Sequence, residues 1–239
     1  MQKVIFYLTY LPLRTYARWA KPRAALVFLF SIHKRLLTLI SDRASDYEGR
    51  RLGLRDGLHP KHRLMQYHRF FTEKLKREEK VLDIGSGRGF LAHEMSKAGA
   101  VVTGIELSQK NIDISNQLYQ NPHLKFIKGD AWKDLPQEKF DVVVMSNVLE
   151  HIDDRVRFLK KVQAEAHPER WLIRVPCFDR DWIVPFAEEL GVDSRLDETH
   201  FTEFTRESFE KEMQASGLKI IHLEVCWGEI WAELIPIQA

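Results

Sequence analysis

A short glycine-rich segment after a run of apolar residues limits most strongly what this chain can fold into. Residues 81–84 (Val-Leu-Asp-Ile) have the texture of a buried strand, and Gly85, Gly87 and Gly89 follow at alternate positions. Glycines let a backbone turn sharply and come close to a ligand. The apolar periodicity after Gly89 predicts a helix, whose N-terminus favours polar or negative groups. The segment therefore predicts the start of a nucleotide-binding α/β unit.

The spacing of these glycines argues against a dinucleotide cofactor. In the Gly-x-Gly-x-x-Gly fingerprint of NAD and FAD units, the third glycine would stand at position 90, where this chain has Phe90. A glycine-rich turn alone is also compatible with an ordinary tight connection between a strand and a helix. Its interpretation depends on residues further along the chain.

Acidic residues stand at the ends of the next predicted strands. Glu106 follows a strand over 101–105, and Asp130 follows a strand over 123–128. A carboxylate at the first position can accept both hydroxyl protons of a ribose, and one at the second can accept an amino proton of adenine. Because ligands bind outside the carboxyl ends of strands in open α/β sheets, the pattern predicts an adenosine-containing ligand.

From residue 80 onward, short apolar runs alternate with amphipathic segments. Five strands with helices between them are predicted over 81–84, 101–105, 123–128, 140–146 and 171–175. This alternation predicts an α/β fold with a parallel sheet covered on both faces. A last helix over 205–215 precedes two strand-like runs, 219–225 and 229–237, whose short connection predicts an antiparallel pair.

With these motifs in order, residues 80–176 resemble the class I S-adenosylmethionine-dependent methyltransferases. The resemblance implies a Rossmann-like seven-stranded sheet, mostly parallel with the last strand antiparallel. It also implies S-adenosylmethionine (SAM) as methyl donor and S-adenosylhomocysteine (SAH) as product. The implied cofactor-binding residues are Asp83, Gly85, Ser86, Gly87, Glu106, Leu107, Asp130, Ala131 and Asn147, with Tyr67 from a segment expected to cover the cofactor.

Glu150 and His151 follow the fourth strand and are the first candidates for removing a proton from the methyl acceptor. The stretch is similar to the ubiquinone-biosynthesis O-methyltransferases, which carry Glu-x-x-Glu-His here and can use a divalent metal. In this chain Asn147 replaces the first carboxylate, so no metal site is predicted, although an asparagine oxygen can serve a hard cation. The Glu-His pair also recurs in the family as a structural helix start.

His200 is the second candidate, and it lies in an irregular insertion, 176–206, before the last helix. Family members place acceptor-facing residues there, and a histidine can accept a proton near neutral pH. The alternative is a helix-entry histidine that bonds only to the local backbone. The residues predicted to take part in catalysis are therefore Glu150, His151 and His200.

The N-terminal part of the chain, 1–78, is predicted to be a basic, amphipathic helical segment ahead of a methyltransferase domain, 79–239. Residues 1–80 contain 18 Lys and Arg against 7 Asp and Glu, whereas the remainder contains 18 against 27. The apolar runs at 4–13 and 24–32 each fall short of the ~20 residues that a spanning helix needs. Apolar runs interleaved with cations suit a helix lying on an anionic membrane surface, or cap helices packed on the domain.

These features predict a SAM-dependent methyltransferase that modifies a small molecule, a lipid or a lipid-linked glycan at oxygen. A cytoplasmic place fits the two cysteines, Cys177 and Cys226, which are too few for a disulfide framework. A peripheral position on the inner membrane face is the finer prediction.

Two alternatives remain open at this stage. The first is a methyltransferase acting on nucleic acid or protein, since the basic N-terminal part can contact phosphates. It is disfavoured because the fourth strand ends in Ser146-Asn147-Val148-Leu149 rather than in the Asn-Pro-Pro-Tyr signature of amino-methylating nucleic-acid enzymes. The second is a non-catalytic, membrane-associated scaffold with a degenerate fold, against which the intact glycines and Glu106 argue.

Overall fold

The computed structural model describes residues 21–51 and 59–237. These residues form two compact units, which are described separately. The first unit lies within residues 1–65 and 181–194, and the second within 66–180 and 195–239. The predicted insertion, 176–206, thus contributes its middle part to the first unit.

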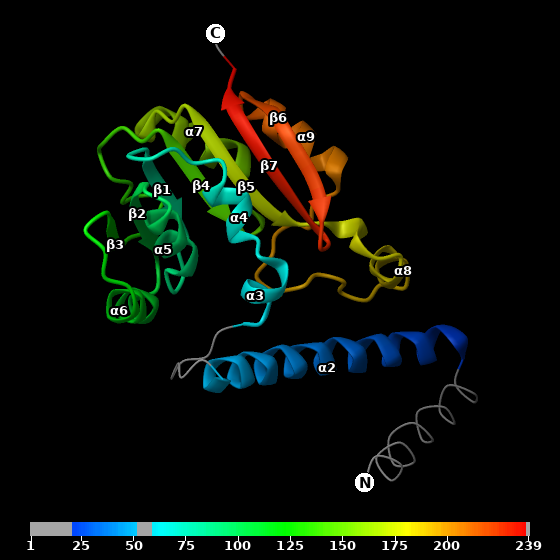
Figure 1. Ribbon diagram of the computed structural model, residues 1–239. Helices are drawn as coiled ribbons and strands as arrows, with labels where there is room; N and C mark the ends of the chain where they lie inside the picture. Colours follow the sequence, from blue (N-terminus) through cyan, green and yellow to red (C-terminus); the bar gives the residue numbers. More distant parts are fainter. Residues whose placement is uncertain (1–20, 52–58, 238–239) are drawn as a thin grey trace. The chain divides into compact units, whose positions relative to one another are not determined.

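The second unit is built on a seven-stranded sheet (Figure 1). Its strands are β1 (Lys80–Ile84), β2 (Val101–Glu106), β3 (Leu124–Lys128), β4 (Val142–Ser146), β5 (Arg170–Pro176), β6 (Leu218–Cys226) and β7 (Glu229–Pro236). They lie in the order β3-β2-β1-β4-β5-β7-β6. The first five pair in parallel, and β7 runs antiparallel to both β5 and β6. The predicted Rossmann-like sheet with an antiparallel last strand is confirmed.

Helices cover both faces of this sheet. They are α4 (His68–Thr72), α5 (Phe90–Lys97), α6 (Gln109–Leu118), η1 (Leu149–His151), α7 (Arg155–Ala166), η2 (Phe178–Arg180) and α9 (Arg206–Ala215). The apolar sides of α7 and α9 supply Phe158 and Phe209 to the main core, where they join Trp171 of β5. In Figure 1, α4 and α5 lie on the other side of the sheet. The central strands β1, β4 and β5 are therefore buried between helices, as their apolar residues require.

Two predicted helix starts owe their position to side-chain caps. The hydroxyl of Ser108 accepts a hydrogen bond from the backbone of Asn111 at the start of α6. Thr205 and Ser208 form a reciprocal capping box at the start of α9. Such caps satisfy backbone N–H groups that have no partner within the helix.

The first unit contains α2 (Pro22–Arg51), α3 (Lys61–Met65) and α8 (Ile183–Glu189). The ring of Phe30 on α2 meets that of Phe186 on α8, with centroids 6.1 Å apart, and Lys34 pairs with Asp193 at 3.1 Å. Glu48 near the end of α2 accepts from Arg63 of α3 at 2.8 Å. These contacts hold α2, α3 and the 181–194 segment together.

The first unit corrects two sequence-based expectations. The apolar run predicted to stop at residue 32 continues through Leu36–Ile40 within the single helix α2, which is long and apolar enough to cross a membrane by length and composition. Lys34 and Arg35, which separate the run 24–32 from Leu36–Ile40, do not interrupt the helix, because Lys and Arg are good helix formers. The insertion predicted to be irregular contains α8, whose Phe186 packs on α2. The other apolar run, 4–13, lies outside the described residues.

Candidate active site

The carboxyl ends of the central strands meet at one edge of the sheet. Ile84, the last residue of β1, stands beside Ile105 of β2 and Met145 of β4 in the strand register. On the other side of β4, Ser146 stands beside Arg174 of β5. The residues that follow β1, β2 and β4 are therefore brought together, as expected for the ligand-binding edge of a parallel sheet.

The glycine turn has two tightly packed positions and one open position. Gly85, Gly87 and Gly89 all have positive φ, at 70°, 55° and 82°. A Cβ on Gly85 would lie 2.6 Å from a methyl group of Val148, and one on Gly89 would lie 2.5 Å from the ring of Phe126. A Cβ on Gly87 would meet nothing within 4 Å. Packing therefore requires glycine at two positions, whereas the space over Gly87 is available to a ligand.

Glu106 ties this turn to the end of β2. One carboxylate oxygen accepts a hydrogen bond from the backbone N–H of Gly87 at 3.0 Å, and the other accepts from that of Ser108 at 2.8 Å. The second oxygen also accepts from Nδ2 of Asn111 at 3.4 Å, so the carboxylate is held at the mouth of the turn.

Two buried polar atoms near the turn lack a partner in the described part of the chain. They are Oδ2 of Asp83, a residue only 2% exposed, and Oγ of Ser86. Burial raises the pKa of Asp83 to about 8, and the nearby charge of Glu106 adds to the rise. Because a buried polar group without a partner is costly, these atoms fit a site that is completed by a polar ligand. Together with the open backbone at Gly87, they fit the amino-acid and sugar parts of SAM.

The residues that follow β2 and β3 offer a place for a planar base. Leu107, after β2, is 70% exposed and presents an apolar surface. Asp130, after β3, accepts from the backbone of Trp132 at 2.9 Å and pairs with Lys133 at 3.0 Å. The hydrogen bond from the Trp132 N–H is the largest cause that lowers the pKa of Asp130, and Lys133 adds to it, so the carboxylate stays charged. Ala131 beside it packs against the main core. The group therefore combines apolar contact with a hydrogen-bond acceptor.

The three predicted catalytic residues come together after β4. Donor atoms of Glu150, His151 and His200 all lie within 4.8 Å of one another, and the two imidazole rings have centroids 4.6 Å apart. The backbone N–H of Phe201 donates to the carbonyl of Glu150 at 2.8 Å, which fixes the insertion against η1. Sequence reasoning proposed Glu150 with His151 and, separately, His200, and the structure brings all three into one cluster.

Each imidazole in the cluster is oriented by a partner on its Nδ1 atom. The Nδ1 of His200 lies 3.0 Å from Oε1 of Glu203, whose other oxygen pairs with Arg180. The Nδ1 of His151 lies 2.9 Å from Oγ1 of Thr199. Such contacts select one tautomer and direct the Nε2 atoms away from these partners.

The carboxyl group of Glu150 is buried without a hydrogen-bond partner among the described residues. The residue is 1% exposed, and neither side-chain oxygen has a partner. Burial raises its pKa to about 7. A carboxyl group with such a pKa can take up or release a proton near neutral pH, which is typical of sites that handle protons.

The same cluster has the composition of a divalent-cation site. One carboxylate and two imidazoles are suitable ligands, and both rings have the outer partners that metal-binding histidines use. Asn147 does not join this group, because its Oδ1 accepts from Nε of Arg174 at 3.3 Å. The third donor comes instead from His200, a position that spacing along the sequence does not reveal.

Sequence reasoning missed Arg174, which lies inside β5 and is only 2% exposed. Its guanidinium pairs with Glu229 of β7 at 2.8 Å and lies over the ring of Tyr67, 3.8 Å from the centroid. Tyr67, the predicted cofactor cover, is therefore buried against this arginine. The signal was present in the sequence, because an arginine interrupts an otherwise apolar strand that should be buried on both faces.

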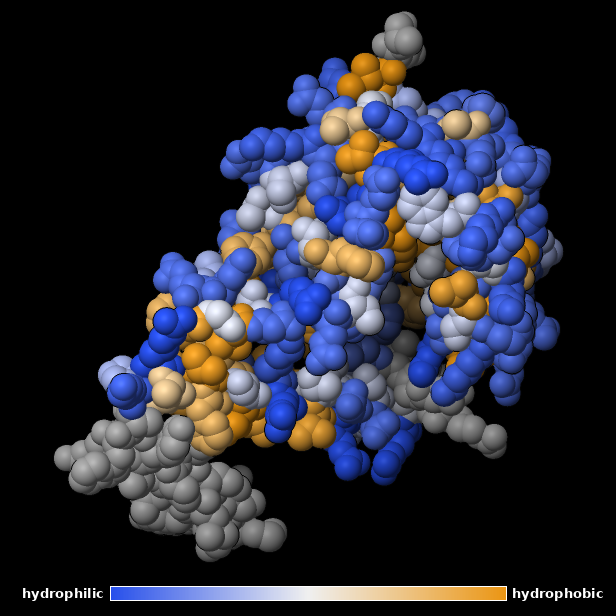
Figure 2. Space-filling model, turned by 180° about the vertical axis from the view of Figure 1, so that it is seen from behind, coloured by the Kyte–Doolittle hydropathy of each residue, from blue (hydrophilic) through white to orange (hydrophobic). Residues whose placement is uncertain are grey.

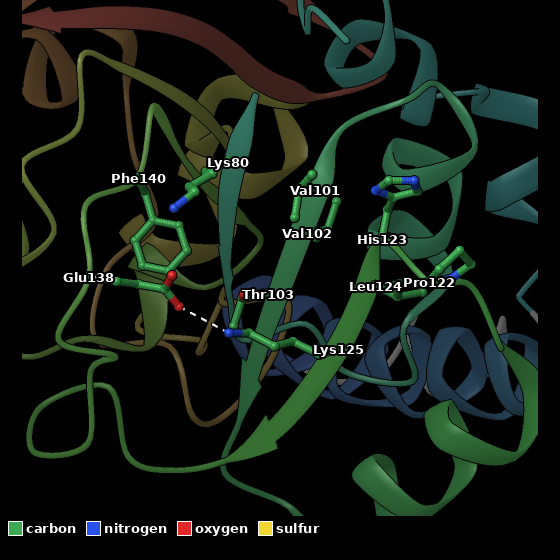
Figure 3. Close-up of a pocket in the computed structure, with 10 residues that line it drawn as sticks. All are labelled: Lys80, Val101, Val102, Thr103, Pro122, His123, Leu124, Lys125, Glu138 and Phe140. Carbon is green, nitrogen blue, oxygen red and sulfur yellow. Dashed lines mark hydrogen bonds and ion pairs between the residues drawn. The ribbon is translucent and has the colours of Figure 1, made fainter. Parts of the chain in front are cut away.

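A surface hollow lies at the opposite end of the strands from this site (Figure 3). Its lining includes the first residues of β1, β2 and β3, namely Lys80, Val101 and Leu124. An ion pair between Lys125 and Glu138, at 3.0 Å, crosses its wall. It takes no part in the candidate site and provides positions for control substitutions.

The comparison with known families agrees with this geometry. A family model described as a methyltransferase domain matches residues 57–223. The chain belongs to this family. It is a class I SAM-dependent methyltransferase, and the resemblance noted for residues 80–176 is confirmed.

Two curated relatives share part of the methyltransferase. The ubiquinone biosynthesis O-methyltransferase of Bradyrhizobium diazoefficiens is 34% identical over 105 residues, 43% of this chain and 41% of the relative. The enzyme of the same name from Coxiella burnetii is 32% identical over 97 residues, 37% of this chain and 39% of the relative. The chain thus matches about two fifths of the length of these relatives.

Solved structures share the fold at lower identity. Magnesium protoporphyrin IX methyltransferase from Synechocystis, solved with bound SAH, has a TM-score of 0.59 and 16% identity, over 84% of this chain and 99% of that one. Mitomycin 7-O-methyltransferase has a TM-score of 0.58 and 20% identity, over 72% of this chain and 53% of that one. These similarities establish the architecture of the methyltransferase.

Proposed function

We propose that this methyltransferase transfers the methyl group of SAM to a hydroxyl oxygen of a small-molecule acceptor. The observation that carries the proposal is the cluster of Glu150, His151 and His200 beside the end of β4, with both rings oriented by outer partners. The partial similarity to ubiquinone biosynthesis O-methyltransferases supports oxygen as the methylated atom.

In this proposal the edge formed by β1, β2 and β3 holds the cofactor. Glu106 accepts hydrogen bonds from the ribose hydroxyls, and Asp130 accepts one from the adenine amino group. Leu107 and Ala131 pack on the adenine ring, while Gly87 lets the chain come close. Bound SAM supplies an electrophilic methyl group on a sulfonium with a good leaving group.

His200 is the proposed general base. A hydroxyl must lose its proton as it becomes methylated, and a base within hydrogen-bond reach accelerates that step. The contact of Nδ1 with Glu203, at 3.0 Å, leaves Nε2 to accept the proton. Glu203 is then a positioning residue that favours the imidazolium formed, as a carboxylate does for the histidine of a hydrolase triad.

The acceptor atom is tested with matched aromatic probes. The protein is incubated with SAM carrying a deuterated methyl group and with catechol, aniline or thiophenol, and products are identified by mass spectrometry. We expect methylation of catechol oxygen alone. Labelling only of aniline, of thiophenol or of added RNA or protein would contradict the proposal. A parallel series with EDTA and added Mg²⁺ or Zn²⁺ tests the alternative that the cluster binds a cation, which would make activity depend on metal.

We also propose that α2 rests on an anionic membrane surface, where lipids or lipid-linked saccharides would be accessible as acceptors. Four apolar side chains of α2 are more than half exposed, namely Leu36, Leu37, Leu39 and Ile40, and Figure 2 shows hydrophobic residues gathered over this helix at the lower left. Lys34 and Arg35 precede this apolar face. Exposed apolar groups beside cations favour the interface of a bilayer with anionic lipids.

Vesicle flotation tests this position. The full chain should float with vesicles containing phosphatidylglycerol and much less with phosphatidylcholine alone, and added salt should weaken the binding. Changing Leu36, Leu37, Leu39 and Ile40 to serine should lower partitioning about tenfold or more, because buried apolar area is lost. Serine at Ile221 and Val225, two half-exposed residues of β6, is the control and should have no effect. Equal flotation of all three proteins would contradict the surface contact, and resistance to alkaline carbonate would indicate a spanning helix instead.

A further inference from the structure

Arg174 lies near the carboxyl end of β5, beside the candidate site. In the register of β5 and β4 it stands beside Ser146, the last residue of β4. After Ser146 the chain continues through Asn147 to Glu150. Its neighbours along β5, Ile173 and Val175, belong to the main core. Because alternate residues of a strand point to opposite faces, the side chain of Arg174 points to the other face, where it meets Tyr67.

The guanidinium of Arg174 is held by hydrogen-bonding contacts with the side chains of Glu229, Asn147 and Tyr67. Its Nε lies 2.8 Å from Oε2 of Glu229 and 3.3 Å from Oδ1 of Asn147. The ring of Tyr67 covers one face of the guanidinium plane. An arginine held in this way is pre-organised, so little side-chain entropy is lost when its remaining donors bind a ligand.

One donor nitrogen of this buried arginine is left over. Nη1 is buried and has no hydrogen-bond partner among the residues that the structure describes. An arginine side chain cannot release its proton in a protein, so this N–H group must be satisfied by something else. An unpaired donor on a buried charge is costly.

The only carboxylate paired with Arg174 in the described structure is shared with other donors. Oε1 of Glu229 accepts from Nδ2 of Asn147 at 3.4 Å, and Oε2 also accepts from Nε1 of Trp231 at 2.9 Å. One negative charge is thus divided among three donor groups. Because it is shared in this way, Glu229 neutralises the charge of Arg174 only in part.

We propose that Nη1 of Arg174 binds an anionic group of the methyl acceptor, a carboxylate or a phosphate, so that the acceptor carries this anion together with the hydroxyl that is methylated. This inference rests on the proposed function for the identity of the bound molecule as the acceptor. Arginine suits the task because its N–H groups match the oxygens of both anions. Arg174 would then determine specificity, while the cluster of Glu150, His151 and His200 acts on the hydroxyl.

The test measures binding to SAH-saturated protein by calorimetry, with pairs of probes that differ only in charge. The pairs are salicylate with salicylamide and phenyl phosphate with phenol, and inorganic phosphate is included alone. We expect the anionic member of at least one pair to bind about tenfold more tightly, and the pair that does so distinguishes carboxylate from phosphate. Arg174→Met should weaken binding of that anion roughly 10- to 100-fold and leave the neutral probe unaffected.

Two further variants separate recognition from structural support. Arg170→Met is the matched control. Arg170 lies at the opposite end of β5 from the candidate site, where it pairs with Glu79 and Glu233. This variant should retain the preference for the anion. Glu229→Gln removes the shared counter-charge while keeping the shape, and it should tighten anion binding several-fold, whereas a purely structural ion pair would give no gain.

The proposal is overturned if the wild-type protein binds charged and neutral probes equally. It is also overturned if Arg174→Met binds SAH with unchanged affinity and still binds the anionic probe more tightly than the neutral one. If Arg174→Met does not fold, the Glu229→Gln result decides, and unchanged or weaker anion binding then counts against the proposal. These readouts need no turnover, so failure of the hydroxyl chemistry can be distinguished from failure of the anion site.

Discussion

Replacing Glu106 with alanine is expected to weaken SAH and SAM binding about 100-fold or more, while the chain keeps its fold. The substitution would remove the two proposed ribose hydrogen bonds to a charged group, each worth about 1.5–3 kcal/mol. Calorimetric titration with SAH measures the loss, and thermal unfolding reports on the fold. Glu138→Ala is the control, since Glu138 pairs with Lys125 at the hollow on the opposite edge. SAH affinity equal to that of the wild-type protein would contradict the assigned site.

A pair of glycine substitutions tests the cofactor position at the turn while Glu106 stays in place. Glu106 also accepts from the backbone of Gly87, so its loss loosens the loop itself. Gly87 and Gly217 have φ values of 55° and 76°, and a Cβ at either would meet nothing within 4 Å. Alanine at each position should therefore cost a similar ~1–2 kcal/mol of unfolding free energy. Only Gly87→Ala should weaken SAH binding, by about tenfold, because the cofactor would occupy the open space over that residue.

Replacing His200 with alanine is expected to lower kcat about 100- to 10,000-fold, the usual contribution of a general base. SAH affinity should remain within about twofold of wild type, because His200 is proposed to contact the acceptor rather than the cofactor. Initial rates with the catechol probe measure the change. His123→Ala, at the hollow in Figure 3, is the control and should retain full activity.

Glu203 distinguishes a catalytic His200 from a structural one. Glu203→Gln keeps a partner for Nδ1 of His200 but removes the charge that favours the imidazolium. We expect a smaller loss of kcat, about tenfold, together with a shifted pH–rate profile. If His200→Ala retains its kcat, or if Glu203→Gln leaves the pH–rate profile unchanged, His200 is a structural residue of the segment before α9 and another group takes the proton.

Local sequence patterns were sufficient for the sheet and for the position of the site. Strand boundaries were predicted to within about two residues, because each apolar run is short and bounded by turn or cap residues such as Gly85 after β1 and Gly217 before β6. These boundaries placed Asp83 and Glu106 near the carboxyl ends of β1 and β2. Because parallel strands have their carboxyl ends at one edge of the sheet, both residues were predicted to lie at that edge. The fold therefore could be predicted without tertiary information, and the resemblance to class I methyltransferases supplied the cofactor class.

The acceptor side could not be derived in the same way. His200 reaches Glu150 only because residues after α8 return to η1, where the Phe201 backbone bonds to that of Glu150. No local periodicity encodes such a contact. Arg174 was overlooked because its strand was assigned from its apolar neighbours, and its partner Glu229 lies 55 positions further along the chain. Both cases depend on contacts between distant segments.

A crystal structure of the full chain with SAH bound would show where the cofactor lies. We expect the ribose hydroxyls on Glu106, the adenine between Leu107 and Asp130, and the sulfur facing the cluster of Glu150, His151 and His200. SAH bound away from Glu106, or a sulfur atom facing away from that cluster, would contradict this expectation.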